Sequence, residues 1–451
     1  MLRNLADFDF LRGQMIPMKD EQLQMGLFKE DLSEMLNPKH PLYLLGERIP
    51  WEVFEKEFKD LYGKTGRPAK PIRLMTALLI LKQLYDLSDE SVIQAWIENP
   101  YYQHFSGMRT FQWKFPVDPT DLVYFRKRIG EKGVSKILEV SISLHGEKAK
   151  EKEVVIDSTV QEKNITFPTD TNLYRGIIQG CLRIAEEEGI TLRQSYTRTT
   201  KALLLDQRFR NHPKNYRKAI KAQKRLKTID GRLVREIGRK TSGNSGKLEL
   251  YEKVLSQQKN DSNKIYSLHE PQVYCIAKGK EHKKYEFGSK ASIAVTKNSG
   301  IIIGALNIRE NTYDGNTLSA TLSQVESLTK NKPSFAICDR GYRGVSEING
   351  TKILIPGRSK KNATPYEKRK VRLRFRRRAA IEPVIGHLKS DYGLVRNYLR
   401  GHMGDGINLM LAAAAFNFSK LMKELASFLF SIFWLIFFSK NTDRGLKWAP
   451  V

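Results

Sequence analysis

The chain has 451 residues, of which 77 are lysine or arginine and 49 are aspartate or glutamate, so its formal net charge is +28. A hydrophobic content of 40% and an aromatic content of 10% exclude a wholly disordered chain, and the length allows two or three domains with cores of their own. A positive charge of this size predicts a polyanionic partner, and double-stranded DNA is the partner we expect.

The cysteines and the N-terminal residues indicate the cellular compartment in which the protein is found. Cys181, Cys275 and Cys338 are too far apart in sequence to indicate a disulfide framework or a structural zinc site. Acidic residues from Asp7 onward and the lack of a sustained apolar core argue against a signal peptide. We therefore expect a cytoplasmic protein of a bacterium, associated with the nucleoid through DNA.

The first part of the chain is predicted to be helical. We expect an N-terminal helical arm over residues 1–60 and an all-α DNA-binding domain over residues 61–150. The predicted helices are Pro71–Tyr85, Ser88–Asn99 and one beginning near Asp118. Proline at a first turn and serine as an N-cap are typical helix starts.

Basic residues in this domain are candidates for DNA contact. The third helix carries Arg126, Lys127 and Arg128, and three short helices with a basic last one predict a helix-turn-helix-like unit. An ordinary bundle with a solvated charged face is the alternative. Just before these helices, Arg67 stands between Gly66 and Pro68, where it could enter a minor groove or lie in a plain turn.

From residue 151 to residue 395 the pattern predicts a mixed α/β catalytic domain in which helices cover a sheet. The predicted elements are the strand Val154–Val160, a hairpin of Lys284–Val295 with Ser299–Ile308, a helix over about 316–328, a strand ending at Asp339, and the strand Lys352–Ile355.

A lysine- and arginine-rich segment interrupts this domain. Residues 171–264 are predicted to form a helical insertion that includes the basic run Tyr216–Lys227. Because the charge excess has one sign, contact with the DNA backbone is the favoured interpretation. A solvated pair of charged helices is the alternative.

Three acids form the candidate catalytic site. Asp157 and Asp339 each end an apolar run, so both are predicted at the C-terminal tips of buried strands. Glu382 lies in a segment of helical character, where Pro383 places a helix start or kink. Such carboxylates can hold two Mg²⁺ ions ~3.5–4 Å apart for phosphoryl transfer. Taken singly, each acid could instead cap a turn or form an ion pair.

The surroundings of these acids are basic. Arg378 and Lys389 flank Glu382 and are predicted to hold a phosphate, or else to neutralise the carboxylate. Tyr342 and Arg343 lie in a tight turn beside Asp339, where the tyrosine either stacks on a base or packs in the core. The run Arg369–Arg378 alternates charged and apolar residues, which suits a strand with one face on DNA, or a basic linker.

The last segment, residues 396–451, is predicted to be a C-terminal helix and an apolar tail. Ala426–Phe438 is apolar and uncharged but shorter than the ~20 residues that span a membrane. We expect a buried or partner-packing helix, or a poorly ordered tail, and no stable membrane association. Membrane attachment is the alternative interpretation.

Together, three motifs resemble bacterial insertion-sequence DDE transposases, most closely the large family usually numbered five. They are Asp157-Ser158-Thr159, the segment Asp339–Gly344, and the spacing of Arg378, Glu382 and Lys389. The resemblance covers about residues 40 to 420. Phe375 stands where the family signature has tyrosine, so a hydroxyl contact to DNA is missing at that position.

The resemblance implies a ribonuclease-H-like catalytic domain with Asp157, Asp339 and Glu382 as ligands of two Mg²⁺ ions per active site, for which Mn²⁺ can substitute. It implies an enzyme that cleaves the ends of its own mobile element and joins them to target DNA. Because two element ends must be brought together in this reaction, we expect a homodimer or larger assembly. Two other interpretations are a catalytically inactive DNA-binding protein derived from a transposase and a host nuclease of the same fold.

Overall fold

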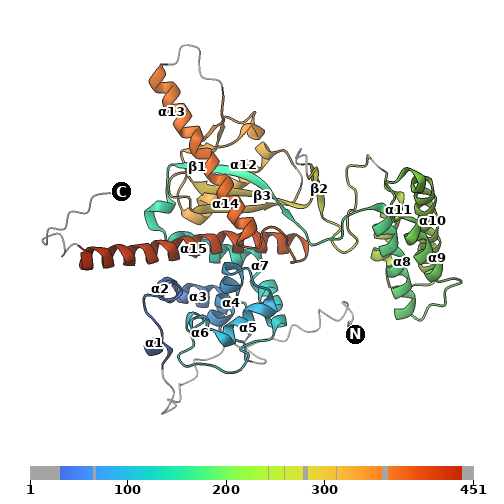
Figure 1. Ribbon diagram of the computed structural model, residues 1–451, viewed down its shortest axis with the longest axis horizontal. Helices are drawn as coiled ribbons and strands as arrows, with labels where there is room; N and C mark the ends of the chain where they lie inside the picture. Colours follow the sequence, from blue (N-terminus) through green and yellow to red (C-terminus); the bar gives the residue numbers. More distant parts are fainter. Residues whose placement is uncertain are drawn as a thin grey trace, which may run out of the picture. The chain divides into compact units, whose positions relative to one another are not determined.

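The computed structural model describes residues 31–63, 68–241, 243–258, 260–277, 283–310, 312–357 and 364–438 (Figure 1). The chain divides into two compact units. The first contains the residues up to Gln161, then Lys290–Leu399, and the residues from Met403 onward. The second contains Glu162–Ser289 and Arg400–His402. The second unit is therefore an insertion in the sequence of the first.

The N-terminal part of the first unit is helical from Leu32 onward, as predicted, whereas residues 1–30 of the predicted arm lie outside the described residues. Its helices are Leu32–Met35 (α1), Pro41–Arg48 (α2), Trp51–Lys59 (α3), Ile72–Leu84 (α4), Asp89–Glu98 (α5), Pro100–Phe105 (α6) and Pro119–Ser143 (α7). Ser88 caps α5 by accepting a hydrogen bond from the backbone N–H of Ser91. Asp118 and Asp121 form a capping box that starts α7. These caps confirm the helix starts expected from the sequence.

A mixed sheet forms the rest of the first unit, and one edge of this sheet continues into the segment Glu162–Ser289. Its strands are Glu153–Glu162 (β1), Tyr274–Ala277 (β2), Tyr285–Thr296 (β3), Ile302–Ile308 (β4), Phe335–Ile337 (β5), Glu347–Ile348 (β6) and Thr351–Leu354 (β7). The order is β2-β3-β1-β5-β7-β6, with β4 also paired to β3. β5 runs parallel to both β1 and β7. The predicted hairpin is confirmed, since β3 and β4 are antiparallel with Lys290 opposite Ile308.

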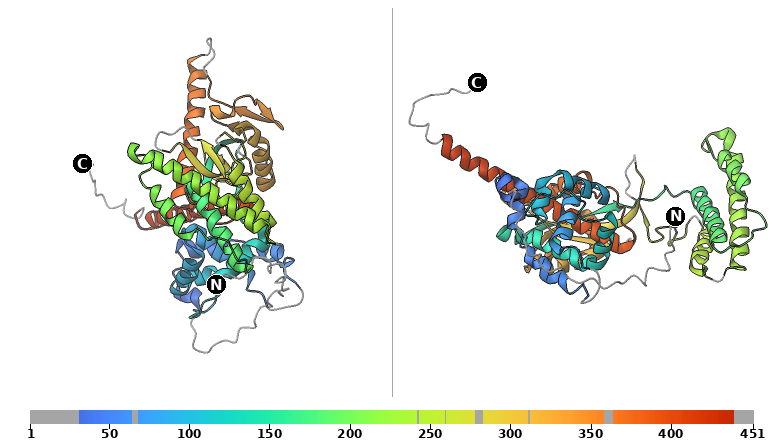
Figure 2. Two further views of the ribbon diagram at one scale, coloured as in Figure 1. Left: turned by 90° about the vertical axis from the view of Figure 1, so that its right-hand side faces the viewer. Right: turned by 90° about the horizontal axis from the view of Figure 1, so that it is seen from below.

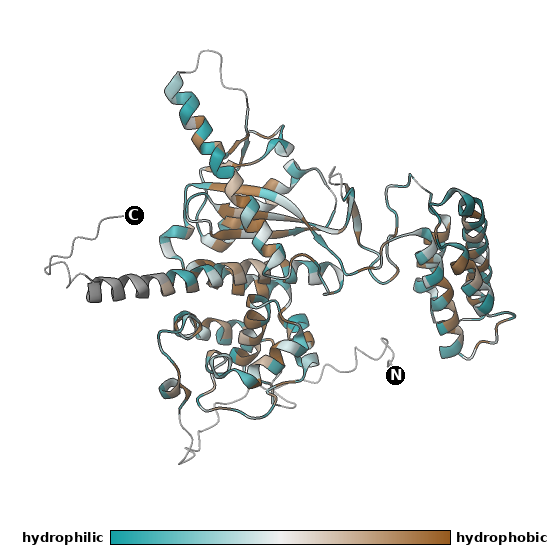
Figure 3. Ribbon diagram, in the orientation of Figure 1, coloured by the Kyte–Doolittle hydropathy of each residue, from teal (hydrophilic) through white to brown (hydrophobic). Residues whose placement is uncertain are grey.

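One hydrophobic core joins the N-terminal helices and the sheet. It extends from Leu42 of α2 through the strands to Leu425 of the last helix, α15 (Gly401–Phe438). The helix α12 (Asp314–Thr329) packs on β4 and on α7. Hydrophobic residues accordingly concentrate on the strands and along the inner faces of these helices (Figure 3). The helices and the sheet therefore stabilise each other.

Asn417 of α15 ties this core together with polar contacts. Its side-chain amide donates to the carbonyl of Ile302 at 2.8 Å and to the hydroxyl of Ser141 at 3.1 Å. Its side-chain oxygen accepts from the backbone N–H of Ile302 at 3.0 Å. Asn417 is fully buried, so one side chain satisfies polar groups of β4 and α7 that water cannot reach.

The second unit contains the predicted helical insertion. Its helices are Asp170–Glu187 (α8), Thr197–Asp206 (α9), Pro213–Gly238 (α10) and Ser245–Ser256 (α11). They pack side by side around α10 (Figure 2). The unit has its own core, built mainly from α8, α10 and α11. Asp230 of α10 is fully buried in this core, and neither carboxylate oxygen has a hydrogen-bond partner among the described residues.

The strand predicted over Arg369–Arg378 is wrong. Thr364 and Glu367 form a capping box, and Pro365 occupies the first turn of a helix, α13 (Pro365–Arg376). Val371 and Leu373, the apolar residues that suggested a strand, are exposed. α13 is predominantly hydrophilic (Figure 3). A capping box and a proline at N1 favour a helix whatever the alternation of side chains.

The predicted C-terminal helix is confirmed as α15, which continues through Ala426–Phe438. In the described part of the chain, no helix combines the length and the apolar character needed to cross a bilayer.

Candidate active site

Asp157 and Asp339 lie on neighbouring parallel strands. Val155 of β1 is opposite Ile337 of β5, and each aspartate is the second residue beyond that pair, so the register places the two carboxylates level with each other. Asp339 follows the end of β5, as predicted. The prediction that Asp157 ends its strand is wrong, because β1 continues to Glu162 beside β3. The site lies instead where the short strand β5 leaves β1.

Asp339 is fixed by the turn that follows it. Its side chain caps the 3-10 turn Arg340–Tyr342 by accepting the backbone N–H of Gly341 at 2.8 Å. A Cβ added at Gly341 would lie 2.9 Å from Asp339 Oδ1 and 3.4 Å from Asp314 Oδ2. Glycine is therefore needed for the backbone to approach these carboxylates so closely.

The two remaining candidates in this turn have different positions. Tyr342 is fully buried, so the predicted DNA contact by its ring is wrong and the core-packing alternative applies. Burial raises the pKa of its hydroxyl above its ordinary range. Arg343 is exposed, and its carbonyl accepts a hydrogen bond from the hydroxyl of Tyr313 at 2.7 Å. Of these two candidates, only Arg343 has a side chain that can reach a ligand.

Glu382 and Arg378 approach the aspartates from a different segment. The helix α14 (Ile381–Ser390) begins just before Glu382, and Pro383 is accommodated in its first turn. Arg378 Nη2 lies 3.3 Å from Glu382 Oε1, and Arg378 Nη1 lies 3.9 Å from Asp157 Oδ2. The guanidinium thus bridges two of the three predicted acids. The Glu382 side chain is 63% exposed, which leaves it room to turn.

Further basic side chains lie along this segment. Lys389 is half-buried on the face of α14 that carries Glu382, about two turns later. Arg374 pairs with Glu153 of β1 at 2.8 Å. Phe375, which replaces the tyrosine of the family signature, is partly buried and packs against the core. His387 is a surface residue whose Nδ1 lies 2.8 Å from Asp391 Oδ2.

A fourth carboxylate, which the sequence did not single out, belongs to the same site. Asp314, at the start of α12, accepts from Lys290 Nζ of β3 at 2.9 Å and from the Ser158 hydroxyl at 3.1 Å. Its other oxygen faces Gly341. An acid in the first turn of a predicted helix normally indicates only a favourable interaction with the positive end of the helix dipole. Asp314 could be found from sequence only by knowing that Lys290 and Ser158 meet there.

The donor types at this site suit a hard divalent cation, which takes carboxylate oxygens. Asp157 and Asp339 are two such donors on adjacent strands. Among the described residues, however, no three His, Cys, Asp or Glu side chains are close enough to hold a metal ion together. Arg378 contacts both Asp157 and Glu382 and supplies the positive charge that balances them. A cation would therefore have to take over the role that Arg378 has here.

In the N-terminal helices, Arg126 does not lie on the surface. It is 5% exposed, and its guanidinium donates to both carboxylate oxygens of Asp89, with one bond of 2.7 Å. Lys82 contacts the same carboxylate at 2.7 Å. Although burial opposes it, hydrogen bonding to Arg126 and the charge of Lys82 lower the pKa of Asp89. The predicted DNA contact by Arg126 is wrong, because this side chain neutralises a buried acid.

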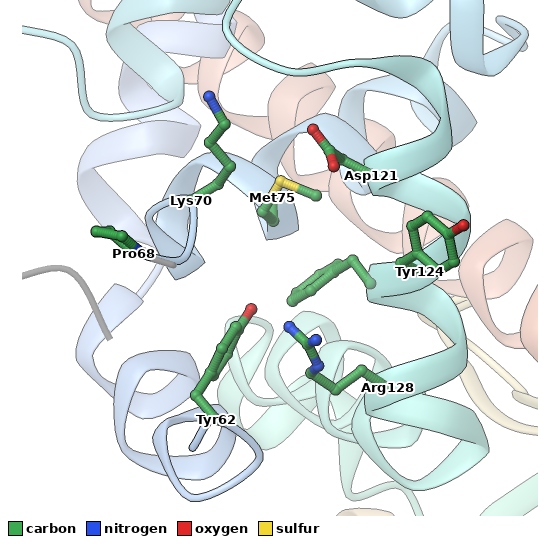
Figure 4. Close-up of a pocket in the computed structure, with 8 residues that line it drawn as sticks. Tyr62, Pro68, Lys70, Met75, Asp121, Tyr124 and Arg128 are labelled. Carbon is green, nitrogen blue, oxygen red and sulfur yellow. The ribbon is translucent and has the colours of Figure 1, made fainter. Parts of the chain in front are cut away.

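The neighbouring basic residues are more accessible. Lys127 is exposed, and Arg128 lies 4.6 Å from the ring centre of Tyr62. Tyr62 and Arg128 face a cavity of about 80 Å³ that Lys70 and Tyr124 also line (Figure 4). Arg67 lies outside the described residues.

Comparisons with known proteins identify the two parts of the chain separately. Residues 30–128 match the family described as "Transposase domain (DUF772)", and residues 256–418 match "Transposase DDE domain". The second match includes Asp339 and Glu382. The "Uncharacterized protein ORF8 in nfe locus" of Rhizobium meliloti is 39% identical over 207 residues, which are 45% of this chain and 100% of that protein. No solved structure gives a significant match.

Both matched domains are described as transposase domains, and Asp157 lies outside the two matched segments. The chain belongs to the DDE transposases of insertion sequences.

Proposed function

We propose that this DNA transposase cleaves the ends of its insertion sequence and joins them to target DNA at a site formed by Asp157, Asp339 and Glu382. The observation that carries the proposal is the level placement of Asp157 and Asp339 on parallel strands, with Arg378 in contact with both Asp157 and Glu382. Carboxylates beside a guanidinium group, which can bind a phosphate through two hydrogen bonds, suit a phosphodiester substrate.

The proposed catalytic domain is ribonuclease-H-like. Support comes from the strand order β4-β3-β1-β5-β7, in which β5 is parallel to its two neighbours and β3 runs antiparallel to β4. In such a sheet the central strand carries one acid and its parallel neighbour the next. We further propose the domain limits 61–150 for DNA binding and 151–395 for catalysis, with residues 1–60 and 396–451 as flanking segments.

The family implies a divalent metal, and Mg²⁺ or Mn²⁺, two ions per site, is our proposal. Asp157, Asp339 and Glu382 would hold the metal, which would stabilise charge on the attacking and leaving oxygens. With Glu382 and Asp157 so occupied, Arg378 would be available to bind a DNA phosphate. Lys389, on the same face of α14, would bind a phosphate beside it.

The residues around Asp339 hold the site in shape. Gly341 gives its backbone N–H to Asp339 and leaves space beside it. Lys290 neutralises Asp314, and Asp314 in turn accepts from Ser158, the neighbour of Asp157. These contacts fix the positions of the carboxylates before the reaction. The carboxylates therefore do not have to rearrange while charge develops in the transition state.

The same site can run both reactions, because each is an in-line displacement at phosphorus. In cleavage, the oxygen of water bonds to phosphorus, the bond to the 3′ oxygen breaks, and a proton passes from the water to the departing 3′ oxygen. In joining, that 3′-hydroxyl attacks a target phosphodiester and a target 3′ oxygen leaves with the proton. No covalent enzyme intermediate is required. Two element ends must meet, so a homodimer or larger assembly is proposed.

The test is strand joining with purified protein, Mg²⁺ or Mn²⁺, and a labelled duplex carrying the native element end. Asp157→Asn, Asp339→Asn and Glu382→Gln should each abolish nicking and joining while DNA binding persists. Glu347→Gln, which changes an exposed acid of β6 that is not one of the site carboxylates, is the matched control and should stay active. A fully active Asp339→Asn protein would refute the assignment.

Two outcomes would favour the rival functions. Tight DNA binding without nicking by the unmodified protein would indicate an inactive DNA-binding derivative. Cleavage of any duplex, without preference for the element end and without joined product, would indicate a nuclease of the same fold.

A further inference from the structure

The helical insertion carries an open basic cleft that lies outside the candidate active site. It has a volume of about 600 Å³ and lies between the loop before α9 and the last turns of α10. Its lining residues are Arg193, Tyr196, Arg232, Arg235, Glu236, Arg239 and Lys240. The basic run noted from the sequence, Tyr216–Lys227, lies earlier in α10, so this cleft is a separate feature.

The sequence of α10 places these charges on one face. Arg232, Arg235 and Arg239 follow the i, i+3, i+7 spacing of a single helix face. The buried residues Ile229, Leu233 and Ile237 lie on the face that packs into the core of the unit. Since packing already uses that other face, the arginine row is not needed to hold the helix in place.

The single acid of the cleft is already engaged. Glu236 accepts Lys240 Nζ at 2.9 Å and the backbone N–H of Arg193 at 2.9 Å, and the latter bond is the main reason that its pKa is lowered. Within the described residues, no carboxylate lies within ion-pair distance of the guanidinium groups of Arg193, Arg232, Arg235 or Arg239. Four arginines and Lys240 therefore share a cleft in which Glu236 is the single acid among the lining residues.

The geometry points to a binding site for the phosphodiester backbone of DNA in this cleft. Guanidinium groups bind phosphate oxygens in pairs of hydrogen bonds, and a row extending over about two helix turns suits successive phosphates better than one small anion. The C-terminal dipole of α10, equivalent to about half a negative charge, is outweighed by four cations. This inference rests on the proposed function only in taking DNA as the polyanion.

The test compares two doubly substituted full-length proteins. Arg235→Ala with Arg239→Ala removes two exposed charges from the cleft, whereas Lys247→Ala with Lys253→Ala removes two exposed charges from α11 of the same unit. Binding to a labelled duplex that lacks the element end is measured from 50 to 200 mM salt. The slope of log K against log salt is about −0.9 for each phosphate contact.

We expect the cleft variant to bind roughly tenfold or more weakly, with a slope shallower by about 1–2, and the α11 variant to bind like the unmodified protein. Equal weakening in both variants would overturn the inference, because it would reflect net charge alone. Unchanged binding by the cleft variant would also overturn it. Circular dichroism checks that each variant is folded.

The strand-joining assay separates this inference from the proposed function. If the unmodified protein joins strands but the cleft variant binds DNA normally, the cleft inference fails and the transposase function stands. If no strand joining occurs but DNA binding still depends on the arginines, the cleft inference stands and the proposed function fails.

Discussion

Replacing Asn417 by leucine should destabilise the first unit strongly. The substitution keeps the side-chain size but removes the two hydrogen bonds to the backbone of Ile302, at 2.8 and 3.0 Å. Ile302 is fully buried, so its N–H and C=O would each lack a partner, at about 1–3 kcal/mol per group. Ser141 loses one bond but keeps its own donation to Leu138. The expected loss is therefore about 2–6 kcal/mol in the free energy of unfolding, a large part of the ~5–15 kcal/mol typical of a native protein.

Urea unfolding followed by tryptophan fluorescence measures this loss. Trp51 and Trp96 are buried in the same core, whereas Glu162–Ser289 of the second unit contains no tryptophan. Met422→Leu, on the next turn of α15, keeps the volume and should cost less than about 1.5 kcal/mol. A loss below about 1 kcal/mol for Asn417→Leu would refute the reasoning, since it would mean that water or another group satisfies Ile302.

Three other substitutions test the site and the insertion. Gly341→Ala should reduce strand joining by about tenfold or more, because the added Cβ would displace the Asp339 carboxylate; thermal unfolding should change little, and full activity would contradict the packing argument. Lys290→Met should reduce joining because Asp314 is left without its cation beside Asp339; adding Asp314→Asn should restore part of the activity, and a double variant that is no better than the single one would count against charge repulsion. Asp230→Asn should stabilise the insertion at alkaline pH. Burial raises the pKa of Asp230 to about 9, whereas an unfolded aspartate has a pKa of about 3.9. When folding raises the pKa of an acid, the folded state loses stability as the pH rises above the pKa of the unfolded state. The loss levels off once the pH exceeds the pKa of the folded state. The gain should be about 2–5 kcal/mol at pH 8 and near zero below about pH 4. Hydrogen exchange in α10 measures it, and a gain independent of pH would show that the carboxylate does not titrate as stated.

Local signals were sufficient to predict much of the fold. Ser88, Asp118 and the apolar hairpin strands act within a few residues of the structure that they specify, and each element formed where expected. The strand predicted over Arg369–Arg378 failed because alternation is a weaker signal than the capping box just before it.

The candidate site was less predictable where it depends on distant partners. The sequence around Asp157 could not show where β1 ends. Pairing with β3 continues this strand beyond the end of β5. The burial of Arg126 depends on Asp89, which comes from another helix. Asp314 joins the site only through Lys290 and Ser158, and no local pattern records those contacts.

The way the insertion leaves the sheet has an evolutionary consequence. β1 ends at Glu162, and the next residue, Lys163, donates its backbone N–H to Phe287 of β3 at 2.9 Å. The chain leaves the sheet at this point and re-enters it as β2 and then β3. Because Lys163 and Phe287 are paired, a short hairpin turn could connect β1 directly to β3 there. Loop length costs little in closure entropy, and α8–α11 have a core of their own. Insertions of very different size could therefore be exchanged here among relatives without altering the register that aligns Asp157 with Asp339.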